Sequence, residues 1–296
     1  MSIKLKPIDQ QVIVITGASS GIGMATAISA YTRGAKLVLA GRSERALGNL
    51  VRQLNDGGGK AIFVKADVAD RAQVEKIADA AIHEFGRIDT WINDSGISIY
   101  GHIWEVSEED NRRLFDTNFW GVVNGSLVAL EHLRANGGAL INVGSEVSES
   151  VVPLQGMYSA SKHAVKGFTD VLRVELEIEK APVSVTLIQP TAVNTPFPQN
   201  AKNYMSKEPK LLDPMIDPQQ VADAILDAAK SPARDVKVGM MATINTAFAK
   251  FAPCIGDKMS ARMADKQHYD MPPKHPDGAL YKPSESAHIH GHAPTR

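Results

Sequence analysis

Short runs of β-branched and other apolar residues alternate along the chain with longer segments in which apolar residues recur every three or four positions. The short runs predict strands buried on both faces, and the longer periodic segments predict amphipathic helices. The predicted strands span residues 11–16, 36–40, 61–67, 89–93, 138–143, 183–189 and 236–239. The predicted helices span residues 21–33, 43–55, 70–85, 107–134, 156–180 and 218–230.

This alternation predicts an α/β fold. Strands joined through helices by short links pair in parallel, with right-handed crossovers. We therefore expect a doubly wound, Rossmann-type, mostly parallel sheet of about seven strands with helices on both faces. Residues 1–250 are expected to form a single dinucleotide-binding catalytic domain. Within it, the proline-rich stretch 192–218 has no regular periodicity and is expected to be a substrate loop.

The C-terminal residues have a different composition from the rest of the chain. Residues 251–296 end in a stretch rich in Pro, Gly, His and Ser. We expect them to form an extension that is arm-like or partly disordered. The alternating His288, His290 and His292 have no acidic or cysteine neighbours at ligand spacing, so we expect no metal site.

Composition narrows the classes of partner. The chain of 296 residues has 32 Lys and Arg against 33 Asp and Glu, a net charge of −1, which argues against nucleic-acid binding. The single cysteine, Cys254, fits a reducing compartment, and we expect a cytoplasmic location. The start of the chain lacks the apolar core of a secretory signal, and no apolar run is long enough to predict a membrane span.

A glycine-rich turn follows the first predicted strand. Gly17, Gly21 and Gly23 are spaced G-x-x-x-G-x-G and lead directly into a predicted helix. Glycine permits close backbone approach, and the start of a helix offers free N–H groups and a partial positive charge to a diphosphate. The pattern therefore predicts a dinucleotide site. A tight turn without a ligand is the alternative that the glycines alone leave open.

The turn after the second predicted strand bears on the choice of cofactor. A carboxylate there would hold the ribose 2′-hydroxyl and repel a 2′-phosphate. Ala40 and Gly41 supply none, and Arg42 and Ser43 follow with groups that can bind a phosphate. We therefore predict NADP(H) in preference to NAD(H).

Tyr158 and Lys162 lie four positions apart on a predicted helix and so share a face. A tyrosine has an ordinary pKa of about 10. A nearby ammonium lowers that pKa, so we expect Lys162 to make Tyr158 a usable acid and base near neutral pH. Taken alone, the four-residue spacing is also compatible with a surface pair of no catalytic role, in which the tyrosine is half-buried.

Taken together, the motifs resemble the short-chain dehydrogenase/reductase family over about residues 10–239. The motifs that carry the resemblance are TGASSGIG at 16–23, Asp67-Val68, NDSG at 93–96, Asn118, Ser145, YSASK at 158–162 and PTAVNT at 190–195. Their joint order is far more specific than any one of them.

The resemblance implies a role for each of four catalytic residues, Asn118, Ser145, Tyr158 and Lys162. Ser145 would hydrogen-bond the substrate carbonyl oxygen, and Tyr158 would give or take the proton. Asn118 would hold a water that links Lys162 to solvent. Lys162 would also hold the hydroxyls of the nicotinamide ribose.

The cofactor would be held along the whole cleft. The resemblance implies that Asp67 and Val68 flank the adenine, that Asn93 bounds the adenosine side, and that Val193 and Thr195 contact the carboxamide. The complete set of predicted cofactor-binding residues is Gly17, Ser19, Ser20, Gly21, Ile22, Gly23, Arg42, Ser43, Asp67, Val68, Asn93, Tyr158, Lys162, Pro190, Val193 and Thr195.

The chain departs from the family pattern at two places. Asp94 and Ser95 stand where the family has small or amide residues, which puts a carboxylate near the adenosine. Thr191 follows Pro190 where the family usually has glycine. Because threonine does not easily adopt a glycine-only conformation, the resemblance does not settle the cofactor geometry at that turn.

These features predict an oxidoreductase that transfers a hydride between NADP(H) and a carbonyl or secondary alcohol. The apolar residues Val147, Val151, Val152, Pro153, Leu154, Phe197 and Met205 predict a fairly hydrophobic substrate, although they can also simply pack a lid. The resemblance implies a homodimer or homotetramer through the helices at 111–134 and 156–180.

Two other functions are compatible with the same fold. A non-catalytic NADP(H)-binding sensor or scaffold is the main alternative, but such relatives usually lose the tyrosine or the lysine. Epimerases and dehydratases tend to carry a larger substrate domain than the region after Val193 supplies.

Overall fold

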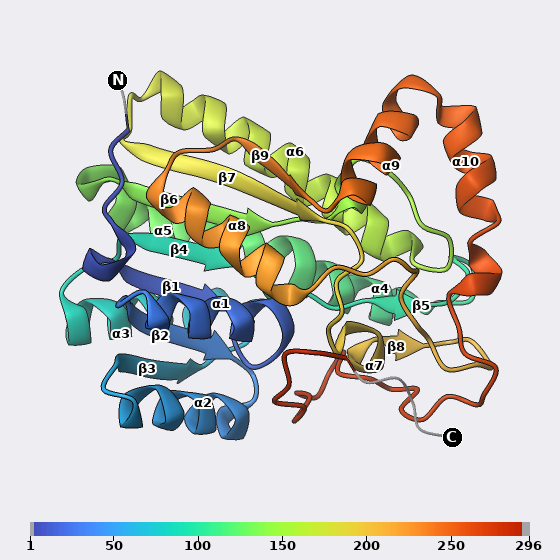
Figure 1. The fold of residues 1–296 in the computed structure, drawn as a ribbon, viewed down its shortest axis with the longest axis horizontal. Helices are drawn as coiled ribbons and strands as arrows, with labels where there is room; N and C mark the ends of the chain where they lie inside the picture. The colour runs from blue at the N-terminus through green and yellow to red at the C-terminus, as the bar shows by residue number, and fades with distance from the viewer. Residues whose placement is uncertain (1–2, 292–296) are drawn as a thin grey trace.

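A computed structural model describes residues 3–291. A seven-stranded sheet forms its centre, with the strand order β3-β2-β1-β4-β6-β7-β9 and every neighbouring pair parallel (Figure 1). The strands are β1 (Val12–Thr16), β2 (Lys36–Gly41), β3 (Lys60–Lys65), β4 (Thr90–Asn93), β6 (Gly138–Val143), β7 (Val183–Pro190) and β9 (Asp235–Val238). A small second sheet pairs β5 (Ile99–Tyr100) with β8 (Lys202–Asn203). The predicted fold class is confirmed.

Helices cover both faces of the large sheet (Figure 1). One face carries α1 (Gly21–Thr32), α2 (Glu44–Asp56) and α8 (Pro218–Lys230). The other face carries α3 (Arg71–Phe85), α5 (Gly121–Asn136) and α6 (Gly156–Ile178). Each layer buries one apolar stripe of its helices against the sheet, which is the arrangement of a doubly wound fold.

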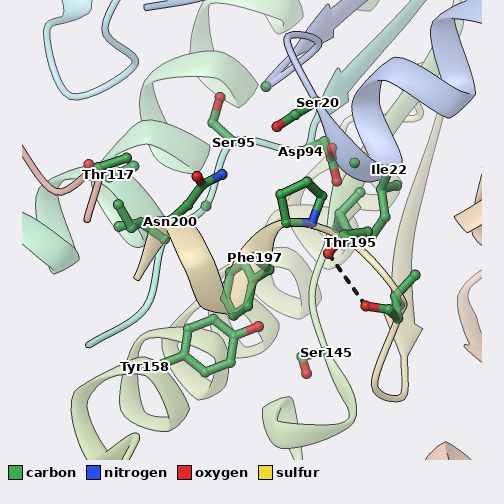
Figure 2. A pocket seen from close by; sticks show the side chains of 18 of the residues that line it. Ser20, Ile22, Asp94, Ser95, Thr117, Ser145, Tyr158, Thr195, Phe197 and Asn200 are labelled. Carbon is green, nitrogen blue, oxygen red and sulfur yellow. Dashed lines mark hydrogen bonds between the residues drawn. The ribbon is translucent and has the colours of Figure 1, made fainter. Parts of the chain in front are cut away.

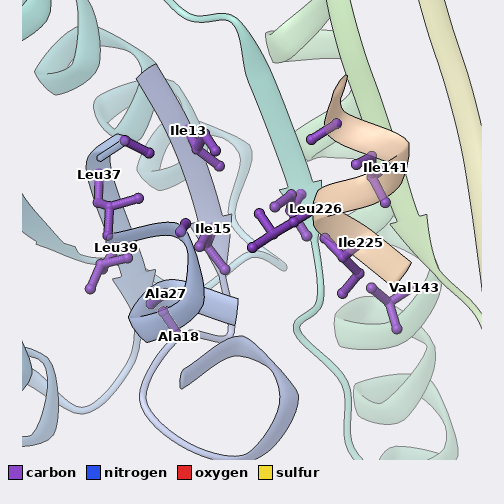
Figure 3. Close-up of a cluster of buried hydrophobic side chains, with 14 of the residues drawn as sticks. Ile13, Ile15, Ala18, Ala27, Leu37, Leu39, Ile141, Val143, Ile225 and Leu226 are labelled. Carbon is purple, nitrogen blue, oxygen red and sulfur yellow. The ribbon is translucent and has the colours of Figure 1, made fainter. Parts of the chain in front are cut away.

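The strands are apolar on both sides because each side meets a helix layer. In β1, Ile13 and Ile15 belong to the cluster under α1 and α8, whereas Val12 and Val14 belong to the cluster under α3 and α5. Figure 3 shows the first cluster, in which Leu226 of α8 lies among strand side chains. This two-sided burial explains why the strands appear in the sequence as continuous apolar runs.

The predicted helix over 107–134 is interrupted. It consists of α4 (Glu108–Phe115), a π-helical turn over Asp116–Trp120, and α5. The Ser107 hydroxyl caps α4 by accepting from the Asp110 N–H. Such π-helical turns are found frequently at functional sites. Here the turn contains Asn118, which is fully buried.

The C-terminal part begins with α9 (Met240–Phe251) and α10 (Pro253–Ala261), which project together from one end of the molecule (Figure 1). Residues 262–291 then return past α7 (Phe197–Asn200) and β8. His290 bonds Asp217 at 3.0 Å, and His292 lies outside the described residues. Within residues 3–291, no helix is long and apolar enough to cross a membrane.

Candidate active site

A large cleft opens at the carboxyl ends of the parallel strands (Figure 2), which is where open α/β sheets bind ligands. Most of the predicted site residues line it together. They are Gly17, Ser19, Ser20, Gly21, Ile22, Arg42, Ser43, Asp67, Val68, Ser145, Tyr158, Lys162, Pro190, Val193 and Thr195.

The glycine loop leaves no space for side chains on its inner side. Gly17 has a φ of +74°, and a Cβ there would lie 2.9 Å from the Ser95 backbone nitrogen. A Cβ on Gly23 would lie 2.5 Å from the Gly17 carbonyl oxygen. The Thr16 hydroxyl accepts from the backbone N–H groups of Asp94 and Ser95, at 3.2 and 3.4 Å, and joins the loop to the turn after β4. This tightly packed loop lines the cleft at the start of α1, where its backbone could hold a dinucleotide diphosphate.

Three of the four predicted catalytic side chains meet at the other end of the cleft. Ser145 follows β6, and Tyr158 on α6 lines the same part of the cleft (Figure 2). Lys162, one helical turn further along α6, has its Nζ 5.9 Å from the centre of the Tyr158 ring. The same Nζ donates to the Val143 carbonyl at 2.8 Å, which holds the ammonium in place.

Burial dominates the electrostatics of this pair. It raises the pKa of Tyr158 to about 12, although the Ser145 hydroxyl acts in the opposite direction. Burial also lowers the pKa of Lys162 to about 8, and the nearby Asp94 charge partly offsets that shift. The pKa of Tyr158 is therefore raised and not lowered as expected, because desolvation of the phenolate is the largest influence on it.

The Asn118 side chain links the segment after β4 to helix α6 through hydrogen bonds. Its side-chain oxygen accepts from the Ile97 N–H at 2.9 Å, and its amide nitrogen donates to the Ile97 carbonyl at 2.8 Å and to the Ser161 hydroxyl at 3.2 Å. It does not line the cleft. The side chain is thus committed to holding the segment after β4 against α6, next to the turn that contains Gly96.

Two predicted cofactor contacts lie outside the cleft. The Asn93 amide points into a buried network, where it accepts from the indole N–H of Trp91 and donates to Ser126 and Asn142. Gly23 packs against the Gly17 carbonyl and does not reach the cavity wall. For Asn93 the reason is strand alternation: its side chain faces the α5 layer, and the next residues, Asp94 to Gly96, line the cleft instead.

The two departures from the family pattern are accommodated. The described non-glycine residues with positive φ are Leu154 and Lys180, so Thr191 does not adopt a glycine-only conformation. Burial raises the pKa of the nearby Glu146 carboxyl, and the Asn245 amide and the Thr191 hydroxyl act in the opposite direction. Asp94 lies against the Gly23 N–H, and burial raises the pKa of its carboxyl to about 8.

Arg42 lies at the mouth of the adenosine end. Its guanidinium donates to the carbonyl of Leu280 at 3.0 Å and to that of Ala279. Burial lowers its pKa, and Asp67, which pairs with Arg113, partly offsets this. The residue predicted to bind a 2′-phosphate thus also holds the C-terminal segment.

Several lining residues were missed by the sequence analysis. They include Glu146, Gln155, Leu211, Leu212, Gln267, Ala279, Pro283 and Ser284. Glu146 could have been found because it directly follows Ser145. The residues after 262 carry no local motif, and they reach the cleft only through tertiary contacts. Within residues 3–291, no three His, Cys, Asp or Glu side chains are grouped as metal ligands.

Comparisons with known proteins agree with this site. A family model described as short chain dehydrogenase matches residues 11–205. The uncharacterized oxidoreductase YxnA of Bacillus subtilis is 44% identical over 294 residues, covering 98% of this chain and 83% of its own. The 11-beta-hydroxysteroid dehydrogenase A of Sesamum indicum is 34% identical, covering 76% of this chain and 64% of its own.

Two solved structures have the same fold. A short chain dehydrogenase/reductase from Burkholderia phymatum in complex with NAD has a TM-score of 0.75 and 28% identity, covering 82% of this chain and 94% of its own. An alcohol dehydrogenase from the archaeon Thermococcus sibiricus complexed with 5-hydroxy-NADP has a TM-score of 0.68 and 26% identity, covering 77% of this chain and 94% of its own.

The chain therefore belongs to the short-chain dehydrogenase/reductase family. It is a NAD(P)-dependent oxidoreductase of the dehydrogenase/reductase type.

The buried ammonium of Lys162 makes a prediction for stability. Its folded-state pKa, about 8, lies below the unfolded value, so the folded protein binds fewer protons above pH 8. Wild-type stability therefore rises with pH between these two values, and Lys162→Met lacks this rise. We expect the stability of the variant relative to wild type to fall by on the order of 2 kcal/mol between about pH 7 and 9.5 in urea denaturation. Lys230→Met, at an exposed lysine, is the matched control, and a pH-independent difference for Lys162→Met would contradict the assignment.

Proposed function

We propose that the enzyme transfers a hydride between NADP(H) and a carbonyl or secondary alcohol carbon of a small, fairly hydrophobic substrate. The bound nicotinamide supplies the hydride chemistry, and the protein orients and polarises the reactants. The observation that carries the proposal is that Ser145 and Tyr158 line one cleft beside a buried Lys162, together with the glycine loop.

Each of the three side chains has a distinct part in this reaction. In carbonyl reduction the Ser145 hydroxyl donates to the substrate oxygen, where negative charge develops. The Tyr158 phenol delivers the proton to that oxygen, and its raised pKa means that it holds this proton firmly in the resting enzyme. The Lys162 ammonium, held by the Val143 carbonyl, stabilises the phenolate left behind.

The substrate end of the cleft supports an apolar substrate. Val147, Val152, Phe197, Leu211 and Leu212 line it, and the Phe197 ring packs on Tyr158 with 5.4 Å between ring centres. The other four residues predicted to line the substrate end do not line the cleft. They are Val151, Pro153, Leu154 and Met205. One relative is by name a hydroxysteroid dehydrogenase, which is consistent with an apolar alcohol or ketone.

The preference for NADP(H) rests on the turn after β2. Arg42 and Ser43 line the cleft there, and no carboxylate stands at Ala40 or Gly41. Charge-assisted hydrogen bonds to a phosphate are stronger than those to a hydroxyl. The two solved relatives carry NAD in one case and 5-hydroxy-NADP in the other, so both forms of the cofactor occur among similar proteins.

Arg42→Asp tests this preference. We expect the ratio of kcat/KM with NADPH to that with NADH to fall by at least about tenfold, because a phosphate donor is replaced by a repelling charge. Arg42 also holds the carbonyls of Ala279 and Leu280, so damaged packing lowers kcat/KM with both cofactors, and the ratio is the quantity that tests the preference. An unchanged ratio would refute the NADP(H) preference.

Tyr158→Phe tests the mechanism. The variant keeps the ring that packs on Phe197 and removes only the proton donor. We expect kcat for ketone reduction to fall by about a hundredfold or more, with NADPH affinity nearly unchanged. Full activity in the variant would overturn the mechanism. If wild type binds NADPH but consumes none with a panel of ketones, the non-catalytic sensor becomes the better explanation.

We also propose that the enzyme is a homodimer or homotetramer. Large apolar side chains are exposed on the two helices expected at the interface, namely Leu127 on α5 and Val171, Val174 and Ile178 on α6. Exposed apolar patches of this kind mark association surfaces. The cytoplasmic location also stays a prediction, supported by the free thiol of Cys254.

Light scattering on the purified protein tests the assembly. Wild type is expected at two or four times the chain mass, and Val174→Glu should shift it towards monomer by placing a charge in the apolar contact. A wild-type protein that is monomeric at micromolar concentration would refute the proposal.

A further inference from the structure

The last described residues are firmly attached to the body of the enzyme. The Ala279 N–H donates to the Asn200 carbonyl at 2.7 Å, and the Tyr281 hydroxyl donates to Asp110 at 2.8 Å. Between them, the Leu280 side chain is fully buried, in a cluster with Ile97, Ile99 and Leu114. These contacts fix the course of the chain just before it crosses the cleft.

From this anchor, residues 283–291 run along the adenosine and glycine-loop end of the cleft. Pro283 and Ser284 line it opposite the turn after β2. Further on, the His288 carbonyl accepts from the Gly21 N–H at 2.9 Å, at the start of α1. The C-terminal segment therefore forms part of the cofactor site as well as covering it.

Glu285 lies between these two contacts and faces the turn after β2. Its carboxylate accepts from the Ser43 hydroxyl at 3.1 Å and from the Arg45 Nε at 2.9 Å. Hydrogen bonds from Arg45 and Ser43 hold the pKa of Glu285 below its ordinary value, so the group is ionised at neutral pH. An anion thus already occupies the donors at the end of β2.

We propose that Glu285 is a specificity-determining residue for the cofactor, and that it supplies from the C-terminal segment the carboxylate that the β2 turn lacks. The inference rests on the proposed function. A 2′-phosphate bound at Ser43 has to displace Glu285 from Ser43 and Arg45, because two anions repel each other at one set of donors. A ribose 2′-hydroxyl is itself a donor, so NAD(H) can bind with the carboxylate in place. Glu285 therefore works against the NADP(H) preference that Arg42 and Ser43 create.

Glu285→Gln is the direct test, because it removes the charge and preserves the shape of the side chain. Dissociation constants for NADPH and NADH are measured by nicotinamide fluorescence on the full-length protein. We expect NADPH to bind about tenfold more tightly than to wild type, whereas NADH binds equally well or a few-fold more weakly. The ratio of the two affinities is the decisive quantity.

Glu44→Gln is the matched control. It removes the same charge one residue after Ser43, but the Glu44 carboxylate pairs with Lys65 at 3.5 Å and not with Ser43 or Arg45. Its affinity ratio should stay within about twofold of wild type, since exposed charges are screened by salt. The measurement is repeated at low and at physiological salt. A specific effect of Glu285 persists at both.

The outcomes separate this inference from the proposed function. If wild type binds neither nucleotide, the proposed function fails, and the inference fails with it. If wild type binds the nucleotides but Glu285→Gln changes both affinities by the same factor, the proposed function stands. In that case Glu285 serves only to attach the segment, and the inference is overturned.

Discussion

The rest of the structure depends on the parallel direction of all seven strands in the large sheet. Because every strand ends at the same edge, the loops that follow β1, β2, β4, β6 and β7 meet there, although they are far apart in the sequence. The crossover helix α6 returns beside that edge and presents Tyr158 and Lys162 one turn apart. The residues predicted to bind the cofactor and those predicted to catalyse the reaction therefore line one cleft as a consequence of topology.

Desolvation is the second factor that shapes this cleft. It pushes the pKa of the Tyr158 phenol up and that of the Lys162 ammonium down, so each group is biased towards its neutral form before any ligand arrives. The Asp94 charge partly offsets this bias for the lysine, and the Val143 carbonyl accepts from its Nζ. The protonation of the two groups therefore depends first on burial and second on their neighbours.

The features that depend on neighbouring residues in the sequence could be predicted from it. Buried strands, the glycine turn, and the four-residue spacing of Tyr158 and Lys162 all follow from short-range patterns, and the structure confirms the fold that they predict. Prediction failed where tertiary packing decides. The Asn93 amide points into the core, and the side chains of Val151 and Leu154 do not line the cleft. The route of residues 279–291 to the turn after β2 has no local signature, since contacts over more than 230 positions create it.

A crystal structure of the enzyme with bound NADPH tests the central claim, that one cleft at this edge holds both the cofactor and the catalytic group. The account predicts the adenosine end between the turn after β2 and residues 279–284, and the diphosphate at the glycine loop. The nicotinamide ring should lie beside Tyr158 and Lys162. A nucleotide bound elsewhere, or bound in the cleft with its nicotinamide directed away from Tyr158, would contradict it.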